Sequence, residues 1–157
     1  MFKSTTLRAA LALPVLSTLF VMLSAGAMSA QAATVTSSAH YQKRIGLNCS
    51  SLSCSGNFPA VAANHVLNLT RLTCLLNATD GSTFSVGGLT ARNVHNAFLL
   101  EEYVAVVHSS SDGAHAINQA VDMQAAATQY MSVQMNLASG TAIGADCVAT
   151  GTMDALQ

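Results

Sequence analysis

The chain has 157 residues, of which 51% are hydrophobic and only 8% are charged, and its formal net charge is −1. This length suits a single ordinary domain that can bury a core of its own. The few basic residues form no patch, so the electrostatic attraction on which nucleic-acid binding depends is missing. We therefore expect no nucleic-acid partner.

Residues 1–32 have the features of a cleavable secretory signal peptide. Lys3 and Arg8 form a short basic region, residues 9–27 are almost wholly apolar, and Ala30-Gln31-Ala32 supplies the small residues that a signal peptidase reads. The apolar run approaches the length of a membrane span. A proline, a glycine and several hydroxyl side chains interrupt it, however, and no charge follows it. We predict cleavage after Ala32.

The predicted mature chain, residues 33–157, is one domain with four basic and seven acidic residues, which gives a formal charge of −3. We expect it to be periplasmic or secreted, with no membrane span once the signal is removed. The short basic region, without any other targeting feature, favours a bacterial cell envelope.

Four cysteines follow the signal, and an even number in an exported chain indicates two disulfides. Sequence alone allows three pairings. We favour Cys49 with Cys54, which closes a small serine-rich loop, and Cys74 with Cys147, which ties an early strand to the last one. Neither a CxxC motif nor a zinc-type Cys/His spacing is present.

Short strand-like segments separated by turn residues dominate the mature chain. Residues 131–137 alternate apolar and polar side chains, which predicts a strand with one wet face. Residues 66–76 are rich in aliphatic and β-branched side chains, and residues 147–153 predict a final strand. After a turn at Asp80-Gly81, we expect Phe84 and Val86 to share one face of the returning strand.

Two segments fit more than one element. In residues 96–108 the apolar side chains fall at helical spacing, yet the valines favour a buried strand. Residues 114–129 are equally ambiguous. Many short strands, frequent turns and two crosslinks predict an all-β fold, a single antiparallel β-sandwich of jelly-roll type, with a short helix near residues 96–108 as the alternative.

The best candidate for a metal site is the segment from His108 to His115. Two imidazoles and the Asp112 carboxylate lie within eight residues, and such ligands suit a transition metal. The alternative is a polar turn in which Asp112-Gly113 reverses the chain and both histidines face solvent.

No catalytic motif is present in the sequence. Glu101 and Glu102 are neighbours, but on a strand they would point to opposite faces and could not act on one bond. The serine-hydrolase pattern Gly-x-Ser-x-Gly is missing. Tryptophan is absent as well, so a carbohydrate-stacking surface would depend on Tyr41, Tyr103 or Tyr130. We therefore expect neither an enzyme nor a cofactor.

These observations predict an exported, non-catalytic β-domain that acts as a binding or structural module of the bacterial cell envelope. Its partner would be an envelope protein or a glycan. One alternative is a self-assembling pilus-like or coat subunit, in which residues 33–40 form an extended arm that adds to a neighbour's sheet. The other is a periplasmic metal-binding protein that uses His108, Asp112 and His115.

Overall fold

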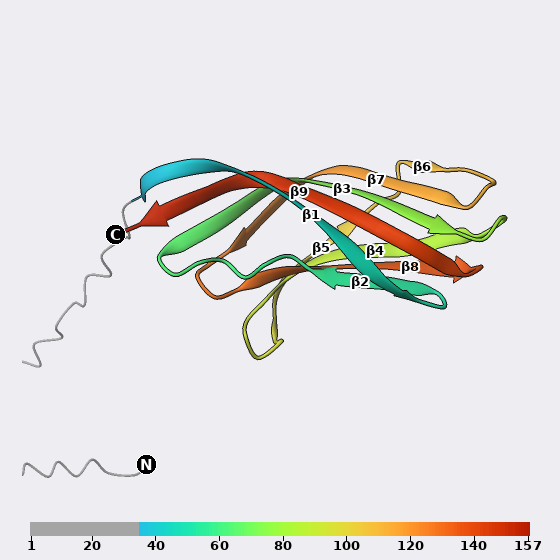
Figure 1. The fold of residues 1–157 in the computed structure, drawn as a ribbon, viewed down its shortest axis with the longest axis horizontal. Helices are drawn as coiled ribbons and strands as arrows, with labels where there is room; N and C mark the ends of the chain where they lie inside the picture. Colours follow the sequence, from blue (N-terminus) through green and yellow to red (C-terminus); the bar gives the residue numbers. More distant parts are fainter. Residues whose placement is uncertain (1–34) are drawn as a thin grey trace, which may run out of the picture. The chain divides into compact units, whose positions relative to one another are not determined.

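The computed structural model describes residues 35–157, so the predicted signal in residues 1–32 and its cleavage site lie outside the described residues. Every regular element of the described part is a strand, and every strand pairing is antiparallel (Figure 1). The all-β antiparallel prediction is confirmed. Within these residues, no helix is long and apolar enough to span a bilayer.

The described residues form one sheet with the strand order β5-β4-β8-β2-β1-β9-β3-β7-β6. The strands are β1 (Val35–Ser50), β2 (Ser53–Asn57), β3 (His65–Ala78), β4 (Thr83–Arg92), β5 (Phe98–Val104), β6 (His108–Ser109), β7 (Ala114–Ala125), β8 (Tyr130–Ser139) and β9 (Ala142–Leu156). The sheet curls into a half-barrel, so two layers face each other as in a β-sandwich (Figure 1). We call them the β9 layer (β1, β9, β3, β7, β6) and the β8 layer (β2, β8, β4, β5).

The core lies between the two layers and is built by alternation along each strand. On β8 the predicted pattern is confirmed, because every second side chain is buried and the residues between them point outward. β3, β7 and β9 follow the same rule, which gives each layer one dry and one wet face. The largest fully buried aliphatic and aromatic side chains are Phe58, Leu67, Leu69, Leu72, Leu76, Leu89, Ile117, Met131, Val133 and Met135.

Both ambiguous segments are strands. Residues 98–104 form β5, so the alternative of a helix near residues 96–108 is wrong. Pairing with β4 explains this result, since β5 satisfies main-chain groups that a helix would leave unpaired at that edge. In the second segment, residues 114–125 form β7 and lie beside β3.

One prediction about β4 is wrong, because Phe84 and Val86 do not share a face. Phe84 packs against the core, whereas Val86 is 37% exposed on the outer side. The ladder shifts register between these two residues, where Phe84 faces Leu137 and Val86 faces Asn136. The extra residue of this β-bulge reverses the alternation.

The structure contains the two disulfides that the favoured pairing predicts, Cys49–Cys54 and Cys74–Cys147. Cys49–Cys54 links β1 to β2 across their turn. Cys74–Cys147 links β3 to β9 in the middle of the β9 layer, where both residues are almost completely buried. The two bonds therefore differ mainly in the length of chain that they enclose, with sequence separations of 5 and 73.

We predict unequal costs for removing the two disulfides. Chain entropy gives about 4 kcal/mol for the loop closed by Cys74–Cys147 and about 2 kcal/mol for the loop closed by Cys49–Cys54. Denaturant unfolding of the two double variants, each with both cysteines of one bond changed to alanine, measures this difference in the free energy of unfolding. Equal losses would show that loop length does not set the stabilisation.

Candidate functional site

His115 occupies a buried position in the β9 layer. Its side chain is 1% exposed, and both ring nitrogens are engaged. The Ser82 hydroxyl lies 2.8 Å from Nε2, and the Ser109 hydroxyl lies 2.8 Å from Nδ1. The Phe84 ring lies beside it, with 6.0 Å between the ring centroids. The imidazole therefore acts as a hydrogen-bonded connector between β7, β6 and the start of β4.

The structure does not bring the predicted ligands His108, Asp112 and His115 together. His108 is exposed on β6, and the Asp112 carboxylate accepts a hydrogen bond from the Ser110 hydroxyl. Within residues 35–157, no group of three His, Cys, Asp or Glu side chains is placed to hold a metal ion. The segment is a turn, as the alternative prediction states, but the expectation that both histidines face solvent is wrong for His115.

The buried imidazole makes stability depend on pH. Burial lowers the pKa of His115 below its ordinary value, because the charged ring would lose its hydration. Below pH about 6.5 the unfolded chain binds a proton that the folded chain resists binding. The folded state therefore loses stability as the pH falls below that value.

We predict that the free energy of unfolding of the wild-type protein falls as the pH is lowered from 7 to 5. The His115 imidazole contributes up to about 1.4 kcal/mol per pH unit to this fall. His115→Gln, which keeps a donor and an acceptor but does not titrate, flattens this slope. His108→Gln on the same hairpin is the matched control and keeps the wild-type slope. Urea unfolding at several pH values gives the comparison, and a wild-type slope in His115→Gln would contradict the prediction.

Glu101 and Glu102 point to different sides of β5, as expected for neighbours on a strand. Glu101 lies on the outer face of the β8 layer. Glu102 reaches toward β7, where its carboxylate accepts hydrogen bonds from the Gln119 side chain at 3.4 Å and from the Asp122 amide at 3.3 Å. Glu102 therefore helps to close the gap between β5 and β7.

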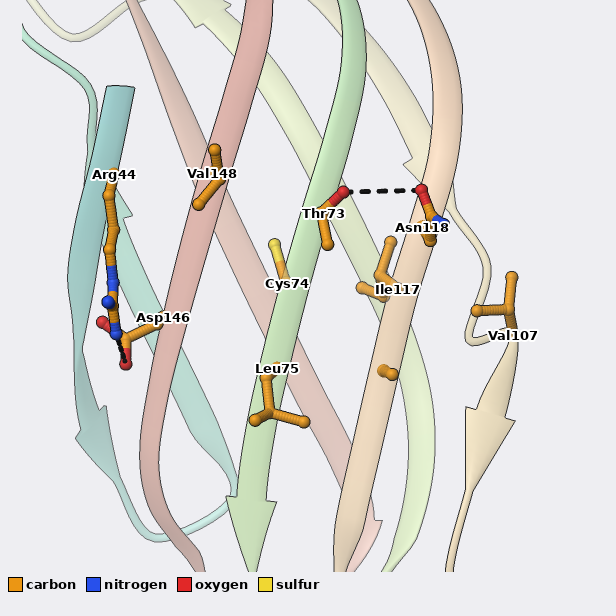
Figure 2. A pocket seen from close by; sticks show the side chains of 10 residues that line it. Arg44, Thr73, Cys74, Leu75, Val107, Ile117, Asn118, Asp146 and Val148 are labelled. Carbon is orange, nitrogen blue, oxygen red and sulfur yellow. Dashed lines mark hydrogen bonds and ion pairs between the residues drawn. The ribbon is translucent and has the colours of Figure 1, made fainter. Parts of the chain in front are cut away.

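A groove of about 510 Å³ lies on the outer face of the β9 layer (Figure 2). It crosses four strands and the segment before β6. At one side Arg44 and Asp146 form an ion pair at 3.0 Å. Further across, the Thr73 hydroxyl donates a hydrogen bond to the Asn118 side-chain oxygen at 3.4 Å.

The floor of the groove is apolar, although it lies on the wet face of the sheet. Leu75 is 47% exposed and Val107 is 61% exposed, and the smaller Val148 and Ala116 lie in the same surface. Small side chains in the middle strands, beside the long Arg44, produce the hollow. Its volume is within the usual range for ligand sites, but it is open to solvent. Such a shape suits a protein segment or a polymer better than an enclosed small molecule.

Sequence reasoning did not find this groove, although one signal was present. Leu75 lies between the inward-facing Cys74 and Leu76, so on a strand it must face outward. An apolar side chain at such a position marks a surface that gains from being covered. That Val107 and Ala116 lie near Leu75 depends on the pairing of β3, β7 and β6, which the sequence does not reveal.

No family model matches the chain, and no curated protein matches it. Among solved structures, the chain is similar to the VP2 subviral particle of infectious bursal disease virus, with a TM-score of 0.37 and 10% sequence identity. The alignment covers 79% of this chain and 38% of the VP2 chain. A likeness this distant carries no argument about what the chain does.

Proposed function

We propose that this chain is an exported, non-catalytic β-domain that acts as a binding or structural module of the bacterial cell envelope. The groove on the outer face of the β9 layer is the observation that carries the proposal. Its exposed apolar floor between polar walls is typical of a surface that meets a partner.

Two further features support an envelope location. Disulfides form and persist in oxidising compartments, and the described residues contain two. The N-terminal residues have the pattern of a secretory signal. An export host should therefore deliver a chain that begins at Ala33, which the intact mass of the purified protein reports.

We predict that the processed protein co-sediments with one of two purified envelope fractions, peptidoglycan sacculi or outer-membrane vesicles. Ala116→Tyr fills the groove floor and should lower the bound fraction at least about fivefold, a change near 1 kcal/mol in binding. Ala120→Tyr places the same side chain on the same strand, outside the groove, and should bind as wild type does.

Three outcomes would overturn this proposal. The first is equal binding by both tyrosine variants, and the second is no binding by wild type to either fraction. The third is turnover of an ester, peptide or glycoside substrate that a single substitution in the groove abolishes, because the chain would then be an enzyme.

A second candidate function is self-assembly, and the open edge of β1 favours it. Residues 35–47 of β1 pair with β9 on one side, while β2 pairs only with residues 48–50 on the other. The predicted arm, residues 33–40, therefore does not extend freely, since its described part pairs with β9 of its own chain. The opposite edge of the strand offers unpaired main-chain groups to a neighbour.

The register shows which groups face the open side. Cys49 and Cys54 are opposite each other with Cα atoms only 4.0 Å apart, which marks a pair without direct main-chain hydrogen bonds. The main chain of odd-numbered β1 residues therefore faces β9. By alternation, the main-chain groups of Ser38, His40 and Gln42 face the open edge.

If the chain self-assembles through this edge, the protein forms oligomers whose mass rises with protein concentration. Size-exclusion chromatography with light scattering measures that mass. Gln42→Pro removes an N–H at the open edge without removing one from the β9 ladder, and it should weaken association at least about fivefold. Gln42→Ala is the matched control and should assemble as wild type does. A wild-type protein that stays monomeric at high concentration would contradict the self-assembly function.

A further inference from the structure

A second hollow, of about 90 Å³, lies on the outer face of the β8 layer, away from the groove on the β9 layer. We call it the β4 slot and define it by the residues Gly88, Glu101, Tyr103, Gln134 and Asn136. They come from three neighbouring strands, β5, β4 and β8.

The register of the three strands explains the slot. Gly88 faces Tyr103 on one side and Gln134 on the other, so these three residues form one row across the sheet. The middle residue has no side chain. Two strand spacings separate the outer positions by about 9.6 Å. The row therefore has no side chain at its centre, and Gly88 lies buried at the floor of the gap between an aromatic ring and an amide.

The side chains around the gap are polar and planar. The Gln134 side-chain amide donates a hydrogen bond to the Asn136 side-chain oxygen at 3.2 Å. The Gln134 carbonyl and the Asn136 amino group are left for a ligand. The Glu101 residue is exposed and borders the same hollow. A donor and two acceptors thus border one small hollow.

Aromatic exposure on this face is high for a protein that has no tryptophan. Tyr103 is 68% exposed and Phe98 is 62% exposed, and both lie on β5 beside the slot. Arg92 stacks on the Phe98 ring, with its guanidinium carbon 3.8 Å from the ring centre. The same guanidinium donates to Thr90 and to Asn96, which fixes it in place.

We infer that the β4 slot binds one pyranose unit of a neutral glycan. A pyranose ring has an apolar C–H face, which suits the Tyr103 ring, and a rim of vicinal hydroxyls, which suit the amides and the Glu101 carboxylate. The carboxylate repels acidic sugars, and the guanidinium of Arg92 is largely engaged within the protein. These charges favour an uncharged ligand.

This inference rests on the proposed binding function but uses a different surface. The groove of the β9 layer would bind a protein segment or polymer, and the β4 slot would bind one sugar unit on the outer face of the β8 layer. Because the slot holds only about 90 Å³, it should bury only part of the ligand, and we expect affinities in the millimolar range.

Gly88 gives the sharpest test. A Cβ at this position would meet the Glu101 carboxylate at 3.4 Å, an ordinary contact, so Gly88→Val fits the strand without strain. Valine also suits a strand better than glycine does. The variant should therefore melt at the wild-type temperature or above it, while its side chain fills the slot.

The experiment titrates the ¹⁵N-labelled protein with three neutral glycans, maltohexaose, cellohexaose and hexa-N-acetylchitohexaose, at millimolar concentrations and follows amide shifts. We expect at least one of the three to move amides of β4, β5 and β8. Gly88→Val and Tyr103→Ala should raise its Kd at least about tenfold, and Tyr103→Phe should keep binding because the ring remains.

Gly144→Val is the matched control, since a Cβ there meets open space and the residue lies outside the slot. It should bind as wild type does. Lack of any shift with all three glycans overturns the inference, as does binding that survives in Gly88→Val. Ala116→Tyr should keep the wild-type glycan shifts. Glycan shifts in a protein whose envelope binding Ala116→Tyr does not weaken would overturn the groove but not the slot. Envelope binding that Ala116→Tyr weakens, without a shift by any glycan, would overturn the slot but not the groove.

Discussion

The pairing of β9 with both β1 and β3 is the constraint on which the rest of the structure depends. It fixes which residues of the β9 layer face the core and which face solvent, because a shift of one residue would turn every side chain over. Cys74–Cys147 locks this register at the middle of the layer. The groove on the outer face is therefore as well defined as the core behind it.

The sequence predicted the features that depend on local pattern. Alternation in residues 131–137 identified a strand and its wet face, and the loop lengths between the cysteines favoured the disulfide pairing that the structure contains. Each of these inferences needs only neighbours along the chain and the period of a strand. The compartment in which the disulfides form was inferred from the N-terminus, outside the described residues.

Three features lay beyond sequence reasoning for a common physical reason, namely that they depend on contacts across strands. The bulge after Phe84 turns Val86 outward, and nothing in the local pattern marks it. His115 is buried because Ser82, 33 residues earlier, satisfies its Nε2. The row of Tyr103, Gly88 and Gln134 exists only once the order β5-β4-β8 is known.

The position of β9 also affects how the fold can form. β9 is the last strand of the described chain, yet it lies between β1 and β3, so the first strand has no neighbour along most of its length until the last one arrives. A chain that emerges N-terminus first, from a ribosome or a translocation channel, cannot complete the β9 layer part by part. The nearly complete chain must be delivered before folding, and this long-range pairing is slow. Such a delay keeps a chain unfolded while it passes through a narrow channel.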